Sequence, residues 1–401
     1  MNEFLTALLQ YTPSLREHPA YNPSSDAGEV QAVTFSLPQL FQKEYETFAY
    51  IGFPKIRKKK MPAVVLVHGG LGHAYFDWVR LWNARGYVAI AMDMEGYYPE
   101  KTDMTKIAYD GKVAFTHGAY GCFKRDGLAD SSKNDAMQSM DKPLEEQWMF
   151  HSIAKGILAH NILRSFEEVE QVGICGISWG SVITSLIIGY DLRFDFAVSI
   201  YGGGYMLKNQ GFCGDNFRDA KVSGDRYLAE KRFNKVKIPT LFVCGDDDAA
   251  FSIDANSLSY NAVKQGNENT RFSIVKGFKH GQNEASHQLE PFFFADSVCK
   301  DTPKLIGFKT EPKGRMVCAE VTGDVKTARA YYLEKSLQYG PRTGVTNNWP
   351  VEMCKEIPCV LHERVVTCTL PDTANCYYVT IEGEREGKPY FVSSPLISCA
   401  E

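Results

Sequence analysis

A serine flanked by glycines and set between two apolar runs is the feature that most constrains this chain. The run Val172–Ile177 leads into Ser178, and a second apolar run begins at Val182. Gly176 and Gly180 stand where side chains would collide in a sharp turn. The pattern predicts a buried strand, a tight turn and a helix, with the serine hydroxyl raised at the turn. Chance would produce such a pentapeptide in roughly one chain of this length in five, so its meaning depends on residues elsewhere.

Composition and charge exclude several classes of protein. Of the 401 residues, 44% are hydrophobic and 23% are charged, which is ordinary for a globular protein. A formal net charge of −4 argues against nucleic acid as a partner. No apolar run is long enough to span a membrane, and the N-terminus lacks the basic start of a signal peptide. We therefore expect a cytoplasmic protein with no membrane partner and with reduced thiols, although pairing among the cysteines of the C-terminal part stays open.

Alternating strand and helix patterns predict a doubly wound, mostly parallel α/β sheet. Residues 63–67 and 87–92 are apolar runs typical of buried parallel strands, and a helical pattern over 74–85 lies between them. A second helical pattern covers 147–165 and precedes the strand that ends at the serine. Further strand patterns in this part of the chain cover residues 45–53, 196–200, 240–244 and 271–275.

Three regions depart from this alternation. Residues 1–45 are interrupted by prolines and are expected to form an N-terminal arm. Residues 46–303 are expected to form the α/β domain, with an irregular insertion over 95–146 that is expected to wall the site. Beyond Pro303, short strand patterns alternate with turns and no helical pattern intervenes, which predicts an antiparallel β-sandwich over residues 304–401.

A serine hydroxyl needs a base to take its proton and an acid to orient that base. In a sheet of this kind the order along the chain is Ser, Asp, His, each at the end of a strand. His280 directly follows a strand pattern, and we prefer it to His287 and His362. Among the acids, the same criterion selects the run 246–248. We favour Asp248, because the last carboxylate of the run is best placed to reach the histidine, with Asp247 as the alternative.

When a serine attacks a carbonyl carbon, the carbonyl oxygen becomes a negatively charged oxyanion. Two backbone N–H donors are needed to stabilise it. The amide of Trp179, directly after the serine, supplies one of them. The glycine-rich loop after residues 63–67 supplies the other, and we favour Gly70 over Leu71. His68 and His73 lack the partnered carboxylate motif of a metal site, so we expect no metal and no cofactor.

A dinucleotide-binding turn is a competing interpretation of the same loop. Gly69–Gly72 follows a strand and precedes a helix, and Asp93 lies about 20 residues further on. Tyr75 occupies the position of the last glycine in that motif. The interpretation also leaves the serine, the histidine and the aspartate without a role.

Together these residues resemble α/β-hydrolases of the acetyl xylan esterase and dienelactone hydrolase-like group, which are related in fold to prolyl oligopeptidase catalytic domains. The similar segments are 65–70, 91–96, 176–180, 245–248 and 280–281. The resemblance implies a serine esterase that removes acetyl groups from acetylated sugars. A general carboxylesterase or a peptidase with the same residues is the alternative enzyme. A carbohydrate-binding protein on a hydrolase scaffold is the alternative that is not an enzyme.

Two residues depart from the pattern of that group. Ser181 stands where a glycine is usual, and Leu71 interrupts the glycine-rich loop. Dienelactone hydrolases proper use a cysteine nucleophile, whereas Cys175 lies inside the strand, three residues before Ser178. Ser181 and Leu71 lie where they can alter the shape of the acyl pocket.

Aromatic and imidazole side chains near the strand ends are weaker candidates for contact with a substrate. They are Trp148, His151 and Tyr201. Aromatic rings stack on sugar faces, but such residues pack in the core more often than they bind ligands. The expected partner is a small-molecule or oligosaccharide ester, and a homo-oligomer is compatible with the sequence.

Overall fold

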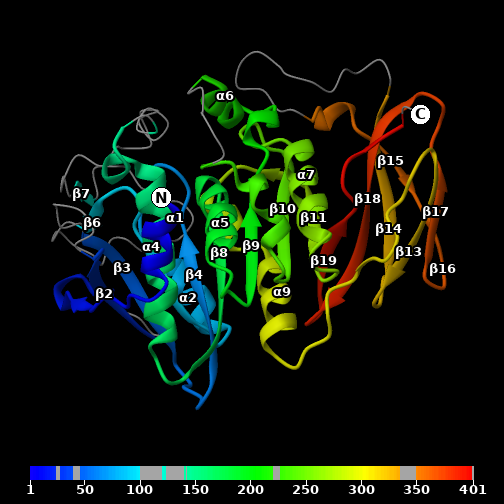
Figure 1. Ribbon diagram of the computed structural model, residues 1–401. Coiled ribbons are helices and arrows are strands. Elements are labelled where there is room, and N and C mark those ends of the chain that lie inside the picture. Colours follow the sequence, from blue (N-terminus) through cyan, green and yellow to red (C-terminus); the bar gives the residue numbers. More distant parts are fainter. Residues whose placement is uncertain are drawn as a thin grey trace.

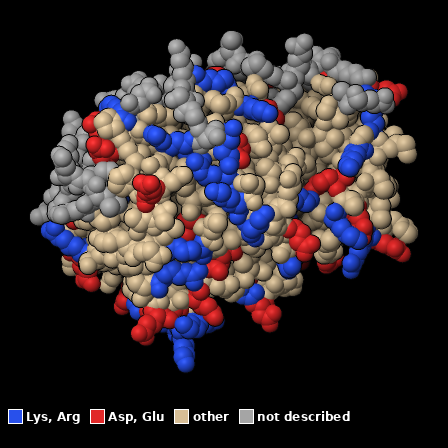
Figure 2. Space-filling view, in the orientation of Figure 1, with Lys and Arg blue, Asp and Glu red and all other residues tan. Residues whose placement is uncertain are grey.

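The computed structural model describes residues 1–23, 28–38, 46–99, 120–122, 140, 142–219, 226–334 and 349–399. Over these residues the chain forms a mostly parallel sheet covered by helices, with an antiparallel β region at its C-terminal side (Figure 1). The fold class predicted from the sequence is confirmed. Basic and acidic side chains are interspersed over the face in Figure 2, in keeping with 44 basic and 48 acidic residues in the chain.

The large sheet has nine strands among the described residues, in the order β1-β2-β3-β5-β4-β8-β9-β10-β11. Neighbours from β5 to β11 are parallel, whereas β1, β2 and β3 are antiparallel. The strands are β1 (Arg16–Glu17), β2 (Gly28–Ser36), β3 (Glu46–Pro54), β4 (Met61–Val67), β5 (Val88–Met92), β8 (Val169–Ile177), β9 (Phe196–Ile200), β10 (Thr240–Asp247) and β11 (Arg271–Lys279).

The described helices lie before, between and after the parallel strands in the chain. They are α1 (Asn2–Leu8), α2 (Phe76–Ala84), α4 (Trp148–Arg164), α5 (Trp179–Tyr190), α6 (Phe212–Asp219), α7 (Ile253–Lys264), α8 (Gln282–Ser286) and α9 (Leu289–Cys299). Short 3₁₀ turns cover Pro19–Tyr21, Leu144–Glu146, Met206–Lys208, Ala229–Lys231, Phe233–Lys235 and Val351–Met353. None of the described helices is both long and apolar enough to cross a membrane.

The strand order reverses between β4 and β8. Helix α2 leads from β4 to β5, and α5 leads from β8 to β9, in the opposite direction along the sheet. Because such crossovers are right-handed, the two helices cover opposite faces. Ligands of open α/β sheets bind at the carboxyl ends of the strands at this kind of reversal. The topology therefore directs attention to the loops after β4 and β8.

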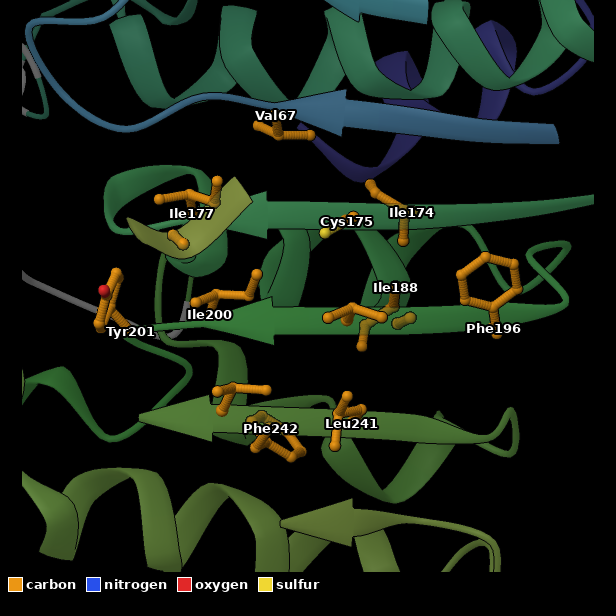
Figure 3. Packing of buried hydrophobic residues seen from close by; sticks show 14 of the residues in the cluster. Val67, Ile174, Cys175, Ile177, Ile188, Phe196, Ile200, Tyr201, Leu241 and Phe242 are labelled. Carbon is orange, nitrogen blue, oxygen red and sulfur yellow. The ribbon is translucent and has the colours of Figure 1, made fainter. Parts of the chain in front are cut away.

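The core lies where β8, β9 and β10 carry apolar side chains on both faces (Figure 3). Phe196 is completely buried, and a Cβ atom on Gly173 of the neighbouring strand would lie 2.1 Å from its ring. Glycine at that position therefore leaves the space that the ring fills. A larger residue there would force the ring or the strand to move.

The N-terminal residues join the large sheet instead of forming only an arm. β2 pairs with β3 along its whole length. Asn161 of α4 donates hydrogen bonds of 2.7 Å to the carbonyls of Leu8 and Tyr11, and Arg193 donates one of 2.8 Å to the carbonyl of Leu9. These bonds hold the end of α1 against the helical layer. The division of the chain into three parts stays a prediction.

The C-terminal residues form two antiparallel sheets. One has the order β12-β13-β17-β16, and the other has the order β15-β14-β18-β19, with β20 beside β18. The strands are β12 (Gly307–Phe308), β13 (Met316–Thr322), β14 (Thr327–Glu334), β15 (Lys355–Pro358), β16 (Val360–His362), β17 (Val365–Thr369), β18 (Ala374–Arg385), β19 (Lys388–Ser393) and β20 (Ile397–Ser398). β19 lies along β11, where the amide of Ile274 donates a 3.0 Å hydrogen bond to Oγ of Ser393.

The predicted insertion over residues 95–146 lies largely outside the described residues. Its described parts include β6 (Tyr97–Pro99), which pairs with β7 (Tyr120–Cys122). Helices α8 and α9, which follow β11, are separated at His287 and Gln288.

The substitution Asn161→Ala tests the attachment of α1. It removes both amide hydrogen bonds from a side chain that is 4% exposed, so we expect the free energy of unfolding in urea to fall by about 1–3 kcal/mol. The exposed Asn234 provides a control, because Asn234→Ala is expected to change stability by less than about 0.5 kcal/mol. Equal unfolding midpoints for the two variants would contradict the attachment.

Candidate active site

Ser178 lies in a strained turn between β8 and α5. Its backbone has φ 58° and ψ −123°, which is unusual for a residue with a side chain. A Cβ atom on Gly176 would lie 2.2 Å from the carbonyl oxygen of Gly180, and one on Gly180 would lie 2.0 Å from that of Val67. Both glycines are therefore needed for the turn to form. The predicted strand, turn and helix are all present at this point.

The structure brings the three predicted side chains into one hydrogen-bonded row. Oγ of Ser178 lies 2.8 Å from Nε2 of His280, and Nδ1 of the same ring lies 3.0 Å from Oδ2 of Asp248. The other oxygen of Asp248 accepts hydrogen bonds from the amides of Ala250 and Phe251, at 2.7 and 3.1 Å. The carboxylate is thus fixed by its own loop and points one oxygen at the imidazole.

Aromatic rings flank the imidazole. The ring of Tyr201 lies 4.7 Å from that of His280, and the ring of Phe251 lies 5.8 Å away and nearly parallel. The Tyr201 hydroxyl donates a 2.5 Å hydrogen bond to the carbonyl of Lys279. The side chain of His280 remains 31% exposed, so its Nε2 edge can meet a substrate while its faces are held.

The loop after β4 lies directly against the serine. A Cβ atom on Gly69 would lie 3.0 Å from Cβ of Ser178, so a side chain there would disturb the nucleophile. The amide of Leu71 donates to Oε1 of Glu95 at 3.2 Å and is therefore already engaged. Of the two amides considered in this loop, that of Gly70 is the better candidate donor to an oxyanion. The amide of Trp179 is the first in α5, where amides have no acceptor within the helix.

A buried lysine supports this loop, and the sequence patterns did not single it out. Lys155 of α4 is 2% exposed, and its Nζ donates to the carbonyls of Asp93 and Met94 at 3.1 and 3.4 Å. Asp93 and Glu95 also attract its charge. Glu95 in turn holds the amide of Leu71. A lysine inside a helix with no polar face is the signal that could have revealed this cluster.

The three weaker candidates have structural roles here. Trp148 is fully buried, and its Nε1 donates to the carbonyl of Met94 at 3.0 Å. Nε2 of the buried His151 lies 2.7 Å from the carbonyl oxygen of Glu145. Tyr201 packs against the imidazole as described above. Their contact with a substrate stays a prediction.

The structure also shows the surroundings of Ser181 and Cys175. Ser181 is fully buried, and its hydroxyl bonds to the carbonyls of Gly176 and Ile200 at 2.7 and 2.6 Å, so it stabilises the turn. Cys175 is buried in β8, where burial raises the pKa of its thiol well above its ordinary value. Within the described part of the chain, no group of three or more His, Cys, Asp or Glu side chains could hold a metal ion.

Comparison with known proteins identifies similar chains. The model of the dienelactone hydrolase family matches residues 48–298. Uncharacterized peptidase YuxL of Bacillus subtilis (strain 168) is 22% identical over 283 residues, which are 64% of this chain and 37% of that protein. The match thus spans little more than a third of that relative's length.

Solved structures with a similar arrangement include acetyl xylan esterase 1 from Thermoanaerobacterium sp. JW/SL YS485. It has a TM-score of 0.47 and 16% identity, over 70% of this chain and 88% of that one. The acylaminoacyl peptidase of Pyrococcus horikoshii has a TM-score of 0.48 and 17% identity, over 70% of this chain and 43% of that one.

Buried imidazoles around the site predict a loss of stability in mild acid. Burial lowers the pKa values of His68 and His151 to about 4, from an ordinary value near 6.5. At a pH between these two pKa values, the unfolded chain binds more protons than the folded chain. The free energy of unfolding should therefore fall as the pH drops from 6.5 towards 4, by about 3 kcal/mol for each histidine.

Urea unfolding at several pH values measures this effect. In His68→Gln the slope of unfolding free energy against pH should be smaller, because one buried imidazole is gone. The exposed His362 supplies the control variant His362→Gln, which should keep the slope of the unsubstituted protein. Identical slopes for all three proteins would contradict the role of His68.

Proposed function

The chain belongs to the dienelactone hydrolase family, and we propose that it is a serine esterase that works through an acyl-enzyme. The observation that carries the proposal is the row Ser178, His280 and Asp248, joined at 2.8 and 3.0 Å. A serine, an imidazole and a buried carboxylate in this order provide a nucleophile, a base and a group that orients the base.

In the first half of the reaction, Oγ of Ser178 attacks the ester carbonyl carbon while its proton passes to Nε2 of His280. Asp248 accepts the hydrogen bond from Nδ1, which keeps Nε2 free to take the proton and stabilises the imidazolium. The amides of Gly70 and Trp179 donate hydrogen bonds to the oxyanion. When the intermediate collapses, the C–O bond to the alcohol breaks, and the departing oxygen takes the proton from Nε2.

In the second half, a water molecule attacks the acyl carbon and gives its proton to Nε2. The bond between Oγ and the acyl carbon then breaks, and Oγ recovers that proton as the free acid departs. The net reaction consumes one water and yields an alcohol and a carboxylic acid. Exposure of one edge of the imidazole permits the water to reach it.

Serine, not cysteine, is the proposed nucleophile. Cys175 is buried in β8 with a raised pKa, so it holds no accessible thiolate. Ser178 stands at the turn and contacts the base. For the substrate we propose an acetyl ester of a carbohydrate, supported by the G-I-S-W-G form of the turn and the other segments that resemble acetyl xylan esterases.

Replacing the nucleophile or the base tests the reaction. Ser178→Ala and His280→Ala should each lower the turnover of an aryl acetate by at least about 10³-fold, because neither the acyl-enzyme nor the proton transfer can then form. The exposed His287 lies in the loop between α8 and α9, and His287→Ala should change turnover less than about threefold. Full activity in Ser178→Ala would exclude the mechanism.

A substrate series tests the choice of ester. Rates should be measured for aryl esters of increasing acyl length, for acetylated xylo-oligosaccharides and for a peptide amide. We expect kcat/KM to be highest for the acetyl esters and acetate to be released from the oligosaccharides. Preference for long acyl chains would indicate a general carboxylesterase, and faster cleavage of the amide would indicate a peptidase.

A further inference from the structure

A buried carboxylate two residues before Asp248 connects the large sheet to the C-terminal sheet that contains β18. Asp246, on β10, is 1% exposed. Its Oδ1 accepts a 2.6 Å hydrogen bond from the amide of Gly277 on β11, and its Oδ2 accepts one of 3.3 Å from the hydroxyl of Tyr378 on β18. One side chain therefore bonds to the strand that leads to the base and to a strand of the C-terminal region.

The bond to Gly277 lies at an irregularity in β11. Gly245 pairs with Val275, but Asp247 pairs with Lys279, so three residues of β11 face one residue of β10. Gly277 has φ 68°, a conformation that favours glycine. Such a bulge turns a strand and redirects the side chains beyond it. The imidazole of the proposed base follows this bulge directly, so the bulge determines where that ring lies.

Two residues at the ends of neighbouring strands, Tyr201 and Gly245, also contact the bulge. The ring of Tyr201 stacks on that of Phe278 at 4.5 Å, and its hydroxyl bonds to the carbonyl of Lys279. A Cβ atom on Gly245 would lie 1.9 Å from the carbonyl oxygen of Phe278, so β10 and the bulge are in close contact. These contacts fix the end of the bulge at Phe278 and Lys279, whereas Asp246 bonds to its middle residue, Gly277.

The C-terminal sheet holds the Tyr378 hydroxyl in place. The residue is fully buried, and its ring stacks on that of Tyr331 at 5.2 Å and lies 5.4 Å from that of Trp349. Nζ of Lys276, in the bulge, lies over the Tyr331 ring at 4.9 Å. These neighbours fix the position of the ring, and its hydroxyl lies within hydrogen-bond distance of Oδ2 of Asp246.

We propose that Asp246 and Tyr378 are positioning residues that set the geometry of the base and its acid, and that this is a task of the C-terminal β region. The hydroxyl orients the carboxylate, the carboxylate holds the bulge amide, and the bulge aims His280 at Ser178. The inference rests on the proposed serine esterase function, because it assigns these residues a role in that reaction.

A purely structural brace makes different predictions. If Asp246 and Tyr378 only stabilise the fold, their substitution would lower the free energy of unfolding. The kcat of the protein that remains folded would then be unchanged. Loss of a positioning contact would lower kcat in the folded protein, because a small displacement of a reacting group has a large effect on rate. It would leave KM nearly unchanged, since neither residue is among the proposed substrate contacts.

The experiment compares three variants of the full chain. Tyr378→Phe removes only the hydroxyl, and Asp246→Asn replaces one acceptor oxygen with a donor. The matched control is Tyr377→Phe, because the Tyr377 hydroxyl donates to the carbonyl of Gly314 instead, at 2.8 Å. For an aryl acetate we expect kcat to fall about fivefold in Tyr378→Phe and at least about tenfold in Asp246→Asn, with KM within about twofold. The control should match the unsubstituted protein.

Imidazole NMR provides a readout that does not depend on activity. The His280 resonances are identified by their loss in His280→Gln, and their chemical shifts and titration are then followed. Both variants should shift the His280 signals and change the pH profile of kcat/KM, whereas Tyr377→Phe should change neither. A phosphonate that labels the serine should react more slowly with both variants.

The outcomes separate this inference from the proposed function. The positioning role is overturned if Tyr378→Phe and Asp246→Asn have the same His280 signals and the same kcat as the control. This holds even if Ser178→Ala is inactive. Full activity in Ser178→Ala would overturn the esterase mechanism, while the NMR comparison would still test the contact. If Asp246→Asn does not fold, Tyr378→Phe alone decides, because it alters a single hydroxyl.

Discussion

The backbones of β4 and α5 approach each other so closely at Gly180 that no side chain fits between them. A Cβ atom there would lie 2.0 Å from the carbonyl oxygen of Val67. This approach places the loop after β4 beside Ser178, at the point where the strand order reverses. The nucleophile and the candidate oxyanion donors are consequently set by the same contact between backbones, and the base and acid are added from the next strands along the sheet.

Much of this arrangement could be predicted because it depends on local patterns. The buried parallel strands are short apolar runs, and the turn at Ser178 has its two glycines at fixed positions. The choice of Asp248 over Asp247 followed from which residue comes last in the strand-end run, and it is Asp248 whose oxygen faces His280. Chain order and strand ends carry this information because parallel strands place all their carboxyl ends at one edge.

What could not be predicted depends on contacts between distant residues. The sequence places Lys155 in a helix with no polar face, but only the folded chain shows that its Nζ bonds to the carbonyls of Asp93 and Met94, just after β5. The bulge at Gly277 is visible only once β10 and β11 are paired. Likewise, Trp148 and His151 follow a pattern that fits a binding surface as well as a core, and their hydrogen bonds to the carbonyls of Met94 and Glu145 are visible only in the folded chain.

The placement of β19 along β11 has a consequence for the order of events during synthesis. Ile274 and Ser393 are 119 residues apart in the chain. At about 5–20 residues per second, a ribosome needs on the order of ten seconds to make the intervening segment. During that interval the strand that carries the base exists with one edge uncovered, exposed to pairing with other nascent chains. Covering of this edge of β11 therefore waits until β19 has been made, and chaperone protection would matter most in that interval.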